Sequence, residues 1–165
     1  ATRQDLAIAH LSHESGKPLL VVLNKWDLVE KDNKTSEHFK ERLYARLDFV
    51  NYAPLLFISA LTGKRVIKIL EFAEQVFRSA SKRVGTSQLN RFLSWLNKNY
   101  SPLAKDKKRV KIKYMTQKGI HPPTFVLFSP WPRSLAPSYQ KLFIHLLREN
   151  FDFWGTPIRL LMRKC

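Results

Sequence analysis

Apolar positions in the first half of the chain follow helical and strand spacing in turn. The pattern predicts helices over residues 3–15, 36–47 and 64–79 and short strands over residues 19–23 and 55–58. Both strand segments are continuous apolar runs, which are typical of strands covered on both faces. Helices and strands alternating in this order predict a parallel sheet with helices on both faces. The first half is therefore expected to be an α/β module.

The second half has a different order of elements. A helix is predicted from Thr86 or Ser87, then strands over residues 110–117 and 124–128, a helix over 138–150 and a strand over 157–163. In the first of these strands, Ile112, Tyr114 and Thr116 are expected to share one face. The order α-β-β-α-β predicts a small α+β domain with helices against one face of a three-stranded sheet. The change of pattern divides the chain into modules 1–82 and 83–165.

Charge divides the chain at the same place. The net charge is +16, of which residues 1–81 carry +2 and residues 82–165 carry +14. A strongly basic module is typical of proteins that bind a phosphate polymer, and no long amphipathic helix with a lysine face favours a membrane instead. The candidate RNA-phosphate contacts are Lys105, Lys107, Lys108, Arg109, Lys111 and Lys113. The alternative is that these side chains form only a solvated loop and strand edge.

Composition excludes several classes of protein and site. No apolar run approaches the roughly 18 residues that a membrane helix needs. Cys165 is the sole cysteine, so an internal disulfide or a cysteine-cluster metal site is excluded. The five glycines lie at least 22 positions apart, which excludes a glycine-rich phosphate loop, a serine-hydrolase elbow and a GxxG nucleic-acid clamp. The first residue, Ala1, is not Met, which indicates a fragment.

The first strand ends in the sequence Asn24-Lys25-Trp26-Asp27, an NKxD motif. The carboxyl ends of strands are where open α/β sheets bind ligands. The Asp27 carboxylate can accept hydrogen bonds from guanine N1–H and the 2-amino group together, a pair of donors that adenine lacks. Asn24 can donate to N7 and join neighbouring loops, and the methylenes of Lys25 can lie on the purine face.

The second strand ends in Ser59-Ala60-Leu61. At the neighbouring position of a parallel sheet, the Ala60 N–H can donate to guanine O6, and the Ser59 hydroxyl can brace the Asp27 loop. Either motif alone is also explained by polar residues that form turns at strand ends. The two motifs after successive buried strands favour a guanine site.

The histidines and tryptophans are weaker candidates for functional residues than the two motifs. His10 and His13 share a helical face without an evident third ligand, so no metal site is predicted. The four tryptophans are separated in the sequence and are expected to be core or loop anchors. Trp131, between two prolines, is the one that we consider as a platform for an RNA base.

Several segments together resemble the C-terminal part of the Der (EngA) family of bacterial GTPases, which have two tandem G domains followed by a KH-like domain. NKWDLV at 24–29 and SALTG at 59–63 resemble two of its guanine-nucleotide motifs. KIKYMTQ at 111–117, PPTFVLF at 122–128 and FDFWGTPIRL at 151–160 resemble segments of its KH-like domain. The resemblance identifies residues 1–82 as the C-terminal portion of a Ras-like G domain.

The resemblance also implies a function. It implies a cytoplasmic GTPase that binds GTP or GDP, acts in assembly of the large ribosomal subunit and docks on ribosomal RNA through a KH-like domain that packs on the G domain. The phosphate loop, both switches and the Mg²⁺ ligands would lie outside this chain, so no catalytic residue is expected within it and the stretch alone should be inactive. The alternative is a non-enzymatic RNA-binding adaptor in which a vestigial G domain serves as scaffold.

Overall fold

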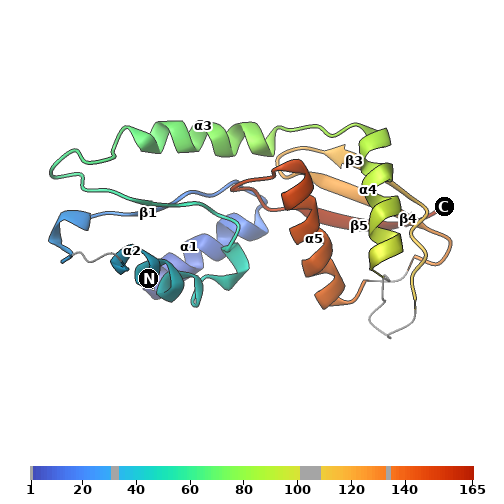
Figure 1. The fold of residues 1–165 in the computed structure, drawn as a ribbon, viewed down its shortest axis with the longest axis horizontal. Coiled ribbons are helices and arrows are strands. Elements are labelled where there is room, and N and C mark those ends of the chain that lie inside the picture. Colours follow the sequence, from blue (N-terminus) through green and yellow to red (C-terminus); the bar gives the residue numbers. More distant parts are fainter. Residues whose placement is uncertain (1, 31–33, 101–108, 133–134) are drawn as a thin grey trace. The chain divides into compact units, whose positions relative to one another are not determined.

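The computed structural model describes residues 2–30, 34–100, 109–132 and 135–165 of the chain. It has a mixed α/β fold in which the described residues form five α-helices and two sheets. Contacts divide the chain into two compact units, which Figure 1 shows in the colours of the sequence. Unit 1 comprises Ala1–Ala80 with Trp154–Pro157, and unit 2 comprises Ser81–Phe153 with Ile158–Cys165.

Unit 1 has the element order that the apolar pattern predicts. Strands β1 and β2 pair in parallel, with Val21 opposite Leu55 and Leu23 opposite Phe57, which confirms the predicted parallel pairing. Two short 3-10 helices, η1 and η2, follow β1 and α2. In chain order the elements are α1 (Arg3–Glu14), β1 (Val21–Leu23), η1 (Trp26–Leu28), α2 (Thr35–Tyr44), η2 (Asp48–Val50), β2 (Leu55–Phe57) and α3 (Lys68–Ala80).

Apolar side chains in unit 1 are only partly covered. All three residues of β1 are half-buried, so the expectation of a strand covered on both faces is wrong for β1. Val21 and Leu23 share one face and pack against the buried cluster of unit 1, whereas Val22 on the other face is in neither buried cluster of the described residues. On α3, whose apolar residues have helical spacing, Leu70 and Phe77 are 68% and 59% exposed. Unit 1 therefore presents apolar surface to solvent.

The segment Trp154–Pro157 belongs by its contacts to unit 1, although it lies between the last helix and strand of unit 2. The backbone C=O of Gly155 accepts from the Leu19 N–H (2.7 Å), and its N–H donates to the Tyr52 C=O (3.2 Å). The Trp154 N–H donates to Ser79 Oγ (2.6 Å). These bonds attach the segment beside the starts of β1 and β2 and the end of α3.

Unit 2 has the predicted α-β-β-α-β order and the predicted three-stranded sheet. The strand order is β3-β4-β5, with β3 antiparallel and β5 parallel to the central β4. Its elements are α4 (Thr86–Asn99), β3 (Tyr114–Gly119), β4 (Thr124–Ser129), α5 (Pro137–Phe151) and β5 (Arg159–Lys164).

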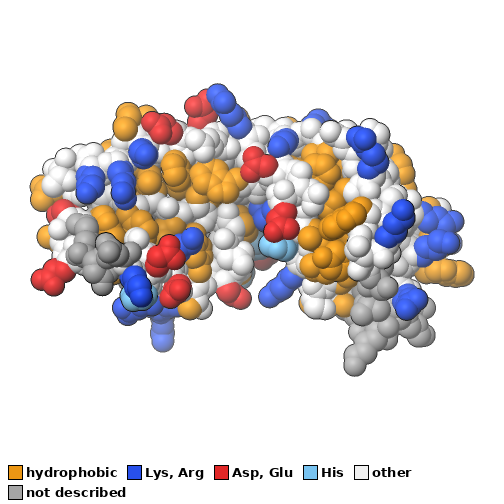
Figure 2. All heavy atoms as spheres, viewed as in Figure 1, with side chains coloured by type: hydrophobic (Ala, Val, Ile, Leu, Met, Phe, Trp, Pro, Cys, Tyr) orange, Lys and Arg blue, Asp and Glu red, His pale blue; other side chains and the backbone are white. Residues whose placement is uncertain are grey.

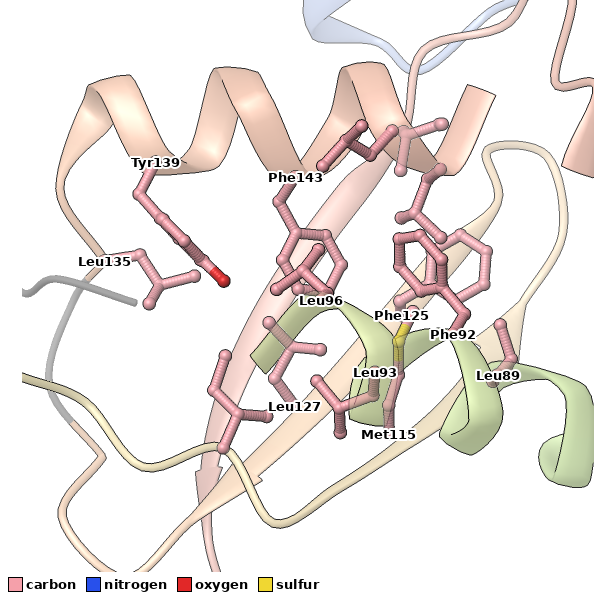
Figure 3. Close-up of a cluster of buried hydrophobic side chains, with 14 of the residues drawn as sticks. Leu89, Phe92, Leu93, Leu96, Met115, Phe125, Leu127, Leu135, Tyr139 and Phe143 are labelled. Atoms are coloured by element: carbon pink, nitrogen blue, oxygen red, sulfur yellow. The ribbon is translucent and has the colours of Figure 1, made fainter. Parts of the chain in front are cut away.

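The core of unit 2 joins both of its helices to the sheet. Figure 3 shows Phe92 and Leu96 of α4 and Phe143 of α5 among side chains of the strands. Phe125 of β4 is completely buried between them. Because one cluster contains side chains of both helices and of the sheet, the helices cover the same apolar layer.

The side-chain alternation before and within β3 differs from the prediction. Ile112 is buried, but Tyr114, expected on the same face, is 44% exposed, and Met115 is completely buried instead. Lys113 N–H donates to the Phe128 C=O, and Tyr114 is the first residue paired in the ladder. The chain therefore shifts by one residue where it joins the sheet, which moves Tyr114 out of the core.

Candidate functional site

The NKWD segment forms a tight turn directly after β1. Lys25 has a left-handed backbone (φ 61°), and Trp26–Leu28 forms η1. The Trp26 N–H donates to the Ile58 C=O (2.9 Å), so the turn is bonded to the end of β2. The Trp26 ring is buried and packs on Phe57, with ring centroids 4.2 Å apart. Trp26, the variable position of the motif, is therefore the anchor that orients the residues on either side.

The SAL segment is held at the end of β2 by its own set of bonds. The Ile58 N–H donates to the Leu23 C=O (2.8 Å), which extends the parallel pairing by one residue. Ser59 is completely buried, its N–H donates to the Lys64 C=O (3.1 Å), and its Oγ accepts from the Thr62 N–H (3.2 Å). The Ser59 side chain thus fixes the shape of its own loop.

One side chain joins the two motif loops. Asn24 Oδ1 accepts from the Lys25 N–H (2.7 Å) and from the Ala60 N–H (3.0 Å). This confirms the expectation that Asn24 joins neighbouring loops. Two N–H donors fix which end of the amide is oxygen, so the Asn24 NH₂ group is directed elsewhere. The Ala60 N–H, expected to donate to guanine O6, donates here to Asn24 Oδ1.

Five of the six candidate guanine-binding residues are exposed to solvent. Asn24, Lys25, Asp27, Ala60 and Leu61 are exposed, and Leu61 is 87% exposed. Only Ser59 of the six is buried. The structure therefore brings the ends of both motifs to one end of the sheet with accessible side chains. Trp26, expected from the sequence to be a core or loop anchor, is buried and bonded to the end of β2, which agrees with that expectation.

The structure describes three of the six candidate RNA-phosphate contacts. Lys105, Lys107 and Lys108 lie outside the described residues. Arg109, Lys111 and Lys113 are exposed, and the last two flank buried Ile112. Their side chains therefore project away from the core of unit 2.

The described part of the chain holds no group of three or more His, Cys, Asp or Glu side chains arranged to bind a metal ion. None of its helices has the length and apolar character needed to span a bilayer.

Comparison with known proteins places these features in a family. Residues 83–163 match the family described as the KH-domain-like region of EngA bacterial GTPase enzymes, C-terminal. The whole chain is similar to GTPase Der of Desulforamulus reducens, 44% identical over 161 residues, which cover 98% of this chain and 37% of that protein. GTPase Der of Halothermothrix orenii is 45% identical over 163 residues, 99% of this chain and 37% of the relative.

The chain belongs to the Der (EngA) family. It spans 37% of the length of these Der relatives. The family match falls on unit 2, and the similarity to Der continues through unit 1, where the NKWD and SAL turns lie. The resemblance given by the sequence motifs is thereby confirmed.

Proposed function

We propose that unit 1 is the C-terminal portion of a G domain and that it binds the guanine base of GTP or GDP. The base would contact Asn24, Lys25, Asp27, Ala60 and Leu61, while the completely buried Ser59 would brace the Asp27 loop. The observation that carries this proposal is the hydrogen bond from the Ala60 N–H to Asn24 Oδ1 (3.0 Å), because it joins two turns at the carboxyl ends of adjacent parallel strands. The name GTPase carried by the relatives agrees with it.

Each side chain has a separate part in this proposal. The exposed Asp27 carboxylate accepts from guanine N1–H and the 2-amino group, and charge-assisted hydrogen bonds of this kind are about twice as strong as neutral ones. The Asn24 NH₂ group donates to N7 while its oxygen holds the turns. The Lys25 methylenes cover one face of the base.

The phosphate-binding part of the enzyme is proposed to lie elsewhere in the protein. Phosphoryl transfer depends on loop backbone, Lys and Mg²⁺ around the γ-phosphate. Because the glycines of this chain lie too far apart for a phosphate loop, the chain would recognise the base without holding the phosphates or Mg²⁺. The 165-residue chain alone is expected to show no low-micromolar GTP binding by calorimetry.

Unit 2 is proposed to dock on ribosomal RNA during assembly of the large ribosomal subunit. Residues 82–165 carry a net charge of +14, and Arg109, Lys111 and Lys113 are exposed. Phosphate contacts release counterions, so RNA binding should weaken steeply as salt rises. Binding that does not respond to salt, or to reversal of these charges, would contradict RNA docking by this surface.

The guanine site is tested by Asp27→Asn in the full-length protein. Loss of two charge-assisted hydrogen bonds should cost about 2–4 kcal/mol of GDP affinity. The Asn amide also offers a donor that complements the 2-carbonyl of xanthine, so affinity for xanthosine diphosphate should rise. Glu30→Gln removes an exposed carboxylate three positions away and should leave both affinities unchanged.

The same measurement separates the enzyme from the adaptor. Unchanged GDP affinity of the Asp27→Asn protein would remove Asp27 from the base site. A full-length protein that binds no guanine nucleotide but still binds RNA would favour the adaptor with a vestigial G-domain scaffold.

A further inference from the structure

Two adjoining hollows lie on the exposed side of α4 in unit 2. The first, of about 350 Å³, lies between α4 and the C-terminal end of α5, and the second, of about 490 Å³, runs along α4. Trp95 and Arg91 line both hollows, so these two side chains form the boundary between the first hollow and the second. We call this surface the Trp95 groove.

The Trp95 ring is both exposed and held in place. It is 43% exposed. Its centroid lies 6.0 Å from that of Phe92 and 5.9 Å from that of Tyr100. An aromatic ring that is fixed by neighbouring rings and open to solvent on α4 can stack with a nucleobase at little cost in side-chain entropy.

Two cations flank this ring on the same helix. Arg91 and Lys98 are exposed and lie four positions before and three positions after Trp95, which puts all three side chains on one face of α4. Of the described residues that line the two hollows, none carries a carboxylate. Figure 2 shows Lys and Arg side chains beside hydrophobic ones over α4 and α5.

The charges favour RNA over a protein as the occupant. Trp and Arg are common at both kinds of interface, but Lys is depleted at protein–protein interfaces. An aromatic platform between Lys and Arg is typical of proteins that bind single-stranded nucleic acid. The glycine spacing excludes a GxxG clamp, so RNA needs another point of attachment on unit 2.

We propose that the Trp95 groove binds an unpaired base of RNA, which stacks on the Trp95 ring, with Arg91 and Lys98 binding the adjoining phosphates. The proposal rests on the proposed RNA docking of unit 2. It adds a site for single-stranded RNA that is distinct from the exposed cations Arg109, Lys111 and Lys113.

The test compares single-stranded and duplex RNA of the same length, about ten nucleotides, by fluorescence anisotropy with the 165-residue chain. Trp95→Ala should weaken single-strand binding by roughly 5- to 100-fold, whereas Trp95→Phe, which keeps an aromatic face, should stay within about threefold. Duplex binding should hardly change, because paired bases are not free to stack. Arg91→Gln and Lys98→Gln should each reduce the salt slope by about 0.7.

A second tryptophan provides the matched control. Trp131 is 71% exposed and lies in the same unit, but it does not line the Trp95 groove. Trp131 is the platform that the sequence alone suggested, so it is also the rival site, and if the base stacks on Trp95 instead, Trp131→Ala leaves single-strand affinity unchanged. If Trp131→Ala weakens binding and Trp95→Ala does not, the platform is Trp131 and the proposal is wrong.

The outcomes separate this proposal from the one on which it rests. Single-strand binding that persists unchanged in Trp95→Ala overturns the Trp95 groove and leaves RNA docking standing, whereas a wild-type chain that binds neither RNA overturns both. If Trp95→Ala does not fold, photo-crosslinking of thiouridine-containing RNA to the wild-type chain replaces it. The expected adduct is on Trp95, and adducts confined to other residues contradict the proposal.

Discussion

Gly155 offers the sharpest test of the packing in unit 1. It has a left-handed backbone (φ 68°) in the segment Trp154–Pro157. A Cβ at this position would lie 2.4 Å from Val76 Cγ2, 2.9 Å from Val76 Cγ1 and 3.1 Å from Pro54 Cδ. Val76 is itself buried on α3, so it has little room to move. Gly155→Ala is therefore opposed by both the backbone conformation and the neighbouring side chains.

Gly63 separates these two costs. Its φ is 73°, close to that of Gly155, but a Cβ there would meet nothing within 4 Å. Gly63→Ala should reduce the free energy of unfolding by about 1 kcal/mol, the cost of a left-handed alanine. Gly155→Ala adds an overpacking cost of about 1–3 kcal/mol, so its total should be about 2–4 kcal/mol.

The assay is urea unfolding of the chain, with hydrogen exchange of the Leu19 amide as a local measurement. The Leu19 N–H donates to the Gly155 C=O, so its protection should fall in Gly155→Ala and not in Gly63→Ala. Val76→Ala removes both clashing methyl groups and leaves only the contact with Pro54, so in that background the cost of Gly155→Ala should fall toward that of Gly63→Ala. Equal losses for the two glycines in the wild-type background would refute the packing argument.

Two further predictions concern polar side chains of unit 2, and the first has a control in unit 1. Tyr139 is buried with a hydroxyl that has no hydrogen-bond partner among the described residues, and burial raises its pKa, so Tyr139→Phe should leave the free energy of unfolding unchanged or raise it by up to about 1 kcal/mol. Tyr44→Phe, the control, removes a hydrogen bond to the Ala53 C=O (2.5 Å) and should cost about 1 kcal/mol by urea unfolding. Asn90 bonds both the N–H and the C=O of buried Met115 (2.9 Å each), so Asn90→Ala should cost about 2–3 kcal/mol in the same assay. A loss under about 0.5 kcal/mol, the size expected of a surface substitution, would contradict that role.

The order of elements could be predicted because it depends on local spacing. Most helices have apolar residues at helical spacing and the strands of unit 1 are continuous apolar runs, and the α-β-β-α-β order of unit 2 and the parallel pairing of unit 1 agree with the structure. The NKWD and SAL motifs could be found for the same reason, since each is a short run directly after a strand.

The spacing of apolar residues along the chain does not predict contacts between residues that are distant in the sequence. Tyr114 continues the alternation begun by Ile112, and only the register with β4 moves it to the exposed face. Nothing in the sequence around Trp26 or Trp95 distinguishes a buried tryptophan from an exposed one. In the structure Trp26 is buried as an anchor, and Trp95 is an exposed ring beside two hollows. Each of them packs on two aromatic rings, so the difference in exposure comes from where the folded chain places them, Trp26 in a turn bonded to the end of β2 and Trp95 on the outer side of α4.

The sequence by itself determined the two kinds of module, the concentration of positive charge in the second and the pair of motifs that end the two strands of the first. Tertiary structure decided that Asn24 Oδ1 bonds the Ala60 N–H, 36 residues away, and that Trp154–Pro157 packs with unit 1. The physical reason is that periodicity records which face of an element is apolar but not which distant segment covers it. That choice depends on side-chain shape and hydrogen bonds that exist only once the chain has folded.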